Sequence, residues 1–127
     1  MQVCSLTITT TVDGVETKLS KQAEMYLDIQ SARIRYHEEN AIVDLEVQGE
    51  GVTIHRQGDY SLFLPLKSGE LTIGELGVGN SKGELRLYTH KVNYTINEES
   101  LLLLLQYDMI MGEETQEMKL RLLARLT

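Results

Sequence analysis

The sequence is poor in residues that brace or interrupt small folds: 127 residues include one cysteine, one proline and no tryptophan. The single thiol, Cys4, excludes an internal disulfide. The longest unbroken apolar run, Leu101 to Leu105, is far shorter than the roughly 20 residues of a membrane-spanning helix. The first ten residues also lack the basic and apolar regions of a signal peptide. We therefore expect a cytoplasmic protein that does not enter a membrane.

Basic residues are scarce as well, with 12 lysines and arginines against 19 acidic residues and a formal net charge of −7. Proteins that bind nucleic acid usually present a basic stripe interleaved with aromatic residues, and none is visible here. The sequence therefore predicts no nucleic-acid partner. Low-complexity segments and linkers are absent too, so residues 1–127 are expected to form a single domain, long enough to bury a full core.

What the sequence does contain is a long alternation of apolar and polar residues. Between Val15 and Gln30 the apolar residues other than Tyr26 occupy only odd positions, which is typical of a strand with one buried face. Similar alternation recurs between turn signals along the chain and predicts about ten strands in neighbour-to-neighbour order. An all-β antiparallel up-and-down barrel, closed or nearly closed, is favoured because closure removes exposed strand edges. A split two-sheet sandwich is the second choice, and a C-terminal helix is an alternative because the tail is rich in helix formers.

The turn at Glu39–Asn40 gives the best-defined register. It matches apolar residues on one face and opposite charges on the other, and such pairs stabilise neighbouring strands by about 0.2–1 kcal/mol each. The pairs are Ile34–Leu45, Tyr36–Val43, Arg33–Glu46 and Arg35–Asp44. At Asp13–Gly14 a type I′ hairpin turn is predicted, because both central residues of that turn need positive φ.

The middle of the chain is less regular. We expect a three-residue loop at Gln57–Asp59 with Gly58 in the left-handed conformation. A turn at Ser68–Gly69 would then place Glu75 opposite Leu62 on the inward face. After a loop from Gly77 to Gly83, the change from odd to even apolar positions predicts a bulge near His90–Lys91.

In this register Arg56 and Tyr60 lie across from one another on the inward face, and Glu75 follows one step along. An unpaired buried guanidinium would cost several kcal/mol, so Arg56 must contact Glu75, Asp59, backbone carbonyls or an anion. One interpretation is a structural link that closes the end of the barrel. The other is an anion site like that of carriers that hold a carboxylate with an inward arginine.

Four apolar residues fall on the predicted outer face of the last two strands: Leu102, Leu104, Ile110 and Leu123. Apolar residues at such positions pack under a terminal segment or against another subunit, so a homodimer through this surface is one expectation.

Metal and cofactor signals are missing. The histidines His37, His55 and His90 lie singly on separate predicted strands, without the spacing of a zinc site. The glycine-rich stretch Gly74–Gly83 lacks the spacing of a phosphate loop and leads into a strand, whereas a phosphate cradle needs a helix N-terminus. We therefore expect no metal and no cofactor, and we interpret Cys4 as a buried structural thiol.

Several short motifs resemble the YwiB-like family of bacterial proteins, which have a lipocalin-like (calycin) barrel and no established activity. The motifs are Arg56-Gln57-Gly58, Ser68-Gly69, Gly83-Glu84-Leu85-Arg86-Leu87, Thr89 and Gln106-Tyr107-Asp108-Met109. The resemblance covers the chain from about Thr11 onward. It implies that Arg56 and Gly58 stand at the family's Arg-x-Gly turn and that Tyr107 is its tyrosine in the penultimate strand. The chain departs from the family after Ile73, where it lacks both the usual tyrosine and the aromatic residue that often precedes the glycine at the start of the next strand. It also has no Gly-x-Trp signature of secreted lipocalins.

The sequence thus predicts a non-enzymatic barrel that binds a small, partly apolar or anionic ligand, or a protein partner. Candidate ligand-binding residues are Arg56, Tyr60, Glu75 and Tyr107. The alternative is a structural or regulatory interaction protein with a filled interior, acting through Leu102, Leu104, Ile110 and Leu123. A barrel of this size has room for packed side chains or for one small ligand, and the pattern leaves both open. An enzyme at the barrel mouth would rest on the Arg56–Glu75 pair alone, and such pairs are more often structural.

Overall fold

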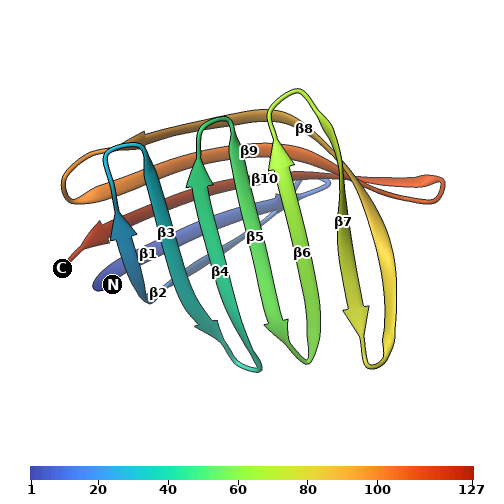
Figure 1. Ribbon diagram of the computed structural model, residues 1–127, viewed down its shortest axis with the longest axis horizontal. Helices are drawn as coiled ribbons and strands as arrows, with labels where there is room; N and C mark the ends of the chain where they lie inside the picture. The colour runs from blue at the N-terminus through green and yellow to red at the C-terminus, as the bar shows by residue number, and fades with distance from the viewer.

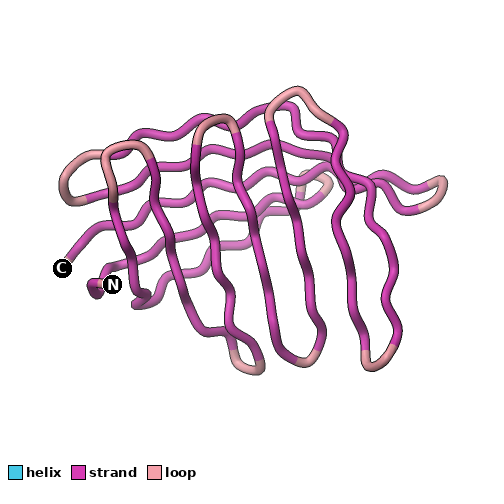
Figure 2. Tube along the Cα trace, in the orientation of Figure 1, coloured by secondary structure: helices cyan, strands magenta, loops and turns pink.

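The computed structural model describes residues 1–127 and consists of ten strands joined by short connections, without helices (Figures 1 and 2). The strands are β1 (Gln2–Val12), β2 (Val15–Leu27), β3 (Ser31–Glu38), β4 (Ala41–Gln48), β5 (Gly51–Gly58), β6 (Tyr60–Lys67), β7 (Leu71–Val78), β8 (Ser81–Ile96), β9 (Ser100–Met111) and β10 (Glu114–Leu126). Each strand pairs antiparallel with its neighbours in the sequence, and β1 also pairs with β10. The sheet is therefore a closed up-and-down barrel, as predicted, and the C-terminal segment is a strand. No helix is present that could cross a membrane.

The barrel is flattened into two layers whose strands run crosswise (Figure 1). One layer contains β3 to β7, and the other contains β9, β10, β1 and most of β2, which pairs with β3 only at Glu24–Leu27. The long strand β8 belongs to both layers, because it pairs with β7 as far as Tyr88 and continues along β9 to Ile96. Its register shifts between Thr89 and Lys91. This confirms the predicted bulge, and because a bulge bends its strand, it turns β8 from one layer into the other.

Two hairpins have the predicted geometry. The β3–β4 ladder contains all four expected pairs, and Arg35 Nε lies 2.8 Å from Asp44 Oδ1 on the outer face. The β1–β2 turn has φ of 49° at Asp13 and 85° at Gly14, as a type I′ turn requires.

The prediction of a three-residue loop at residues 57–59 is wrong. Gly58 is the last residue of β5, pairs with Ala41, and does not have positive φ, so only Asp59 connects β5 to β6. Glycine is needed here for close approach: a Cβ on Gly58 would lie 2.0 Å from the carbonyl oxygen of Asn40. The shorter connection moves the β5–β6 register by two residues, so the inward face keeps its residues, and Arg56 lies opposite Leu62.

The predicted direction of Glu75 is also wrong. Strands β6 and β7 pair only between Tyr60–Phe63 and Glu75–Val78, and Glu75 lies opposite Phe63. Because the connection from β6 to β7 contains three residues, Ser68–Glu70, the inward side chains of β7 are at even positions. Glu75 therefore points outward.

The segment Gly77–Gly83 is not a loop. It forms the ends of β7 and β8 and the two-residue turn Gly79–Asn80 between them. Gly79 has φ of 60°, which glycine adopts without strain.

Twenty buried side chains form a single cluster between the two layers. Fully buried members come from both: Leu6, Met25, Ile34, Val47, Val52, Leu87, Leu101, Leu103 and Leu122. On β9 the buried residues Leu101, Leu103 and Leu105 alternate with half-buried Leu102 and Leu104, as expected for a strand with one face on the core.

Candidate functional site

Arg56 lies on the inner face of β5, near the end of the barrel where the β3–β4 and β5–β6 connections meet. Arg56 is only 8% exposed to solvent. Nε donates a hydrogen bond to Glu38 Oε2 (3.2 Å), Nη1 donates to the carbonyl oxygen of Tyr60 (2.7 Å), and Nη2 lies 2.9 Å from Asp59 Oδ1. The guanidinium also lies 3.7 Å from the ring centre of Tyr60, within cation–π range.

These contacts occupy each nitrogen of the Arg56 guanidinium. The hydrogen bond from Arg56 lowers the pKa of Asp59, so this carboxyl stays ionised beside the cation. With two carboxylates already in contact, the guanidinium has its charge compensated from within the chain. The geometry supports the structural link among β3, β5 and β6 and leaves little room for a ligand anion at this point.

Of the partners expected for Arg56, the structure provides Asp59 and a backbone carbonyl but not Glu75. The Glu75 side chain is half exposed on the outer surface, 3.6 Å from Lys82 Nζ. Sequence reasoning missed Glu38, although its even position continues the inward series of Ile34 and Tyr36 along β3.

Tyr107 is buried on the inner face of β9, opposite Thr89 and Met118. It forms no hydrogen bond with Arg56 and belongs to the other layer, so the predicted quartet is not assembled in one place. Burial raises the pKa of Tyr107 to about 12. Burial, with the nearby Glu38 carboxylate, also raises the pKa of Tyr36 to about 12.

These two tyrosines should make the barrel sensitive to alkali. A tyrosine whose pKa is higher in the folded state than its ordinary value of 10 stabilises the folded state while it is protonated. This stabilisation is present below pH 10 and is lost as the pH rises toward 12. We expect the free energy of unfolding to fall by about 1 kcal/mol per tyrosine between about pH 9 and pH 11. Urea unfolding across this range should show a smaller fall in a Tyr107→Phe variant. An identical fall in Tyr107→Phe would contradict the assignment, and Tyr26→Phe, an exposed site, serves as the matched control.

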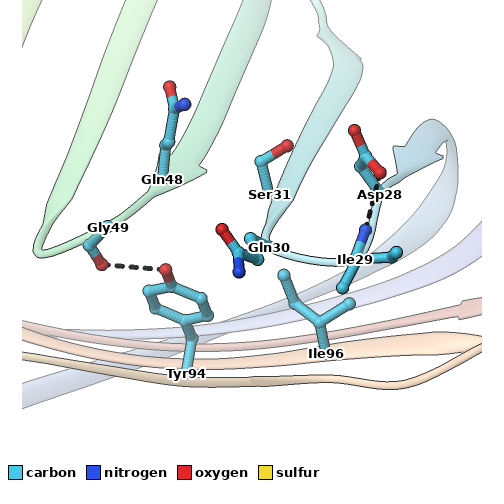
Figure 3. A pocket seen from close by; sticks show the side chains of 8 residues that line it. All are labelled: Asp28, Ile29, Gln30, Ser31, Gln48, Gly49, Tyr94 and Ile96. Atoms are coloured by element: carbon cyan, nitrogen blue, oxygen red, sulfur yellow. Dashed lines mark hydrogen bonds between the residues drawn. The ribbon is translucent and has the colours of Figure 1, made fainter.

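The largest cleft lies at the opposite end of β5 from Arg56, where the β4–β5 turn meets the second half of β8 (Figure 3). Its volume is about 780 Å³. Eight residues line it: Asp28, Ile29, Gln30, Ser31, Gln48, Gly49, Tyr94 and Ile96. Sequence reasoning did not predict this cleft, because the surrounding turns come from distant parts of the chain.

A hydrogen bond between the two layers forms one wall of this cleft. Tyr94 rises from β8 and its hydroxyl donates to the carbonyl oxygen of Gly49 at 2.8 Å (Figure 3). On the other side, Asp28 Oδ1 accepts a hydrogen bond from the backbone amide of Ile29 at 2.7 Å, which orders the β2–β3 connection. A neighbouring hollow of about 430 Å³ shares Asp28, Ile29 and Ile96, so the open region continues along the edge of the barrel.

The chemistry of the lining is mixed. The Gln30 amide points toward Tyr94 and can donate and accept hydrogen bonds, whereas the side chains of Gln48 and Ser31 point away from the cleft (Figure 3). Ile29 and Ile96 provide apolar surface, and Ile29 is 88% exposed at the rim. Such a lining can hold a neutral molecule that is part polar and part apolar.

The predicted outer residues Leu102, Leu104 and Leu123 do lie on the outer face of β9 and β10. Leu102 and Leu123 are direct ladder partners, and Leu104 lies two residues from Leu102 on the same face. Ile110 stands apart, opposite Thr115 and Arg86. All four are half-buried, so neighbouring side chains cover part of each.

Comparison with known proteins supports the family suggested by the motifs. The family model described as "Domain of unknown function (DUF1934)" matches residues 1–122. Among curated proteins none matches the chain. The crystal structure of the ywiB protein from Bacillus subtilis is similar, with a TM-score of 0.87 and 17% sequence identity over 99% of this chain and 92% of that chain. At this identity the likeness establishes the shared barrel fold and confirms the resemblance to YwiB-like proteins. The chain therefore belongs to the DUF1934 family.

Proposed function

We propose that this barrel is a non-enzymatic binding protein that holds a small, neutral, partly apolar molecule in the cleft between the β4–β5 turn and β8. The cleft itself is the observation that carries the proposal. Its volume of about 780 Å³ lies within the range of small-molecule sites, about 300–1,000 Å³. The buried cluster between the layers fills the middle of the barrel, so the ligand is bound at the rim of the barrel and not inside it.

The cleft lining favours binding over chemistry. Its hydrogen-bonding side chains are mainly amides and hydroxyls, which orient a ligand without transferring a proton to it at neutral pH. The carboxylate of Asp28 already accepts a hydrogen bond from the backbone amide of Ile29.

The buried Cys4, whose thiol pKa is raised by burial, fits a protein kept in the reducing cytoplasm.

Native mass spectrometry of protein freshly purified from cells tests this proposal. We expect a small-molecule adduct on the unmodified protein and its loss, by about tenfold or more in occupancy, in a Gln30→Trp variant, because the side chain of residue 30 points into the cleft toward Tyr94 (Figure 3). Gln57→Trp is the matched control, because Gln57 is exposed near the Arg56 end of β5. An adduct that survives in Gln30→Trp, or its absence from the unmodified protein, would refute the cleft as the site.

A second candidate function is interaction with another macromolecule through the outer face of β9 and β10. The adjoining side chains of Leu102, Leu104 and Leu123 favour it, because apolar residues gathered on a solvent-facing sheet often mark a contact surface. A homodimer through this face is one form of such an interaction, and the subunit count from native mass spectrometry tests it.

A further inference from the structure

Exposed lysines and arginines that form no ion pair lie around Leu102, Leu104 and Leu123 on the outer face. Five of the twelve basic residues lie on the outer face formed by β8, β9, β10, β1 and β2, and all five are exposed and outside the ion pairs of the molecule: Lys18, Lys91, Lys119, Arg121 and Arg125. By contrast, the other layer neutralises its outward cations within the sheet, as in the pairs Arg33–Glu46 and Arg35–Asp44.

The ladder registers bring these cations together. Lys119 lies opposite Gln106, which in turn lies opposite Lys91. In the next row Arg121 lies opposite Leu104. A groove of about 330 Å³ runs over this region, and three cations line it together with Leu104, Leu105, Leu120, Gln106, Thr9, Thr11 and Glu16. We call the groove and its surrounding cations the cationic face.

The charge of the cationic face is opposite to that of the whole protein. Glu16 is the only carboxylate in the groove, whereas the chain has 19 acidic and 12 basic residues. Glu117 and Asp108 form the next ladder pair on the same face, beside Lys119 and Gln106, and Asp108 contacts His90. A protein that supplies carboxylates would form ion pairs with these exposed cations. Such electrostatic complementarity speeds association and favours this protein over other partners.

A second copy in a symmetric face-to-face dimer would bring two cationic faces together, which the repulsion of like charges opposes. A head-to-tail contact with the acidic remainder of another copy would continue from copy to copy into a ring or an open chain and would not give a simple dimer. A nucleic acid bound to this face would also bring phosphates close to the surrounding acidic side chains. Because the protein has a net charge of −7, these phosphates would be repelled.

We infer that the cationic face binds an acidic segment of a partner protein. An apolar side chain of the segment occupies the groove over Leu104, and flanking carboxylates lie against Lys91, Lys119 and Arg121. This inference rests on the second proposed function and gives its partner a chemical class.

Fluorescence polarisation with a defined probe tests the inference. The probe is a short fluorescein-labelled peptide in which glutamates flank leucines, and its matched partner carries glutamine in place of each glutamate. We expect the glutamate peptide to bind more tightly and to weaken as salt is added. The triple variant Lys91→Gln, Lys119→Gln, Arg121→Gln should lose about tenfold or more in affinity. Leu104→Ser should weaken binding without changing the salt dependence.

The control removes the same number of charges elsewhere: Arg33→Gln, Lys67→Gln, Lys82→Gln, at exposed positions away from the cationic face. Equal loss in the two triple variants would show a mere net-charge effect and overturn the inference. So would equal binding of the two peptides, or tighter binding of a single-stranded oligonucleotide or of phosphatidylglycerol vesicles. A homodimer that Leu102→Lys dissociates, with no binding of the glutamate peptide, would overturn the acidic partner and leave the second proposed function standing.

Discussion

Replacing Gly74 by alanine is expected to lower the free energy of unfolding by about 2–3 kcal/mol, although it adds only one methyl group. Gly74 is buried in β7, and a Cβ there would lie 2.4 Å from the carbonyl oxygen of Phe63 and 3.0 Å from Leu87 Cδ1. The oxygen belongs to the backbone of β6, so it can move only if the two strands separate. Their ladder is short, with pairing confined to Tyr60–Phe63 and Glu75–Val78, and has little reserve for such a movement.

Urea unfolding of Gly74→Ala should be compared with that of Gly83→Ala on the next strand. A Cβ on Gly83 meets no atom within 4 Å, and its φ is compatible with alanine. Gly83→Ala should therefore leave stability unchanged or raise it by about 0.4–1 kcal/mol, because alanine has less conformational freedom in the unfolded chain. Equal destabilisation by both substitutions would show that the close contact at Gly74 is not the cause.

The second large effect is expected from Leu122→Ala, which should lower the free energy of unfolding by about 3 kcal/mol. Leu122 is fully buried on the inner face of β10, between Leu103 of β9 and Ile8 of β1. Its truncation removes apolar contacts from both sides and leaves a cavity that the surrounding strands cannot fill.

Leu123→Ala is the matched control for this experiment, one residue further along the same strand. Leu123 is half-buried on the outer face, so its loss should cost about 1 kcal/mol or less. Chemical denaturation of both variants measures the difference directly. A Leu123→Ala variant as unstable as Leu122→Ala would contradict the alternation of inner and outer side chains on β10.

The alternation of apolar and polar residues predicted the fold well because burial on one face controls every second residue of a strand. It placed Cys4 and Met25 correctly among the buried residues, and Leu102, Leu104 and Leu123 correctly on the outer face. It predicted register only where a regular turn fixed the pairing, as at Glu39–Asn40. Glu75 was misplaced because the three-residue connection before β7 shifts side-chain direction by one position.

The candidate site was less predictable than the fold. The buried Arg56 and its need for a partner followed from its position among apolar residues, and Asp59 followed from proximity in the chain. Glu38 is eighteen residues away, and only the correct turn geometry brings it within reach. The cleft at Tyr94 and Gly49 depends on the bend in β8, which joins segments 45 residues apart. A contact between such distant segments produces no periodic pattern in the sequence of either segment.

The pairing of β1 with β10 also has a consequence for biosynthesis. Leu6 in β1 finds its ladder partner, Ala124, only after β10 has left the ribosome. Until then the emerging β1–β2 hairpin keeps one edge open, and each new strand extends a sheet that cannot yet close. Such long-range closure makes folding slow and leaves incomplete chains prone to aggregate, so nascent copies of this barrel should depend on chaperones more than a helical protein of equal length.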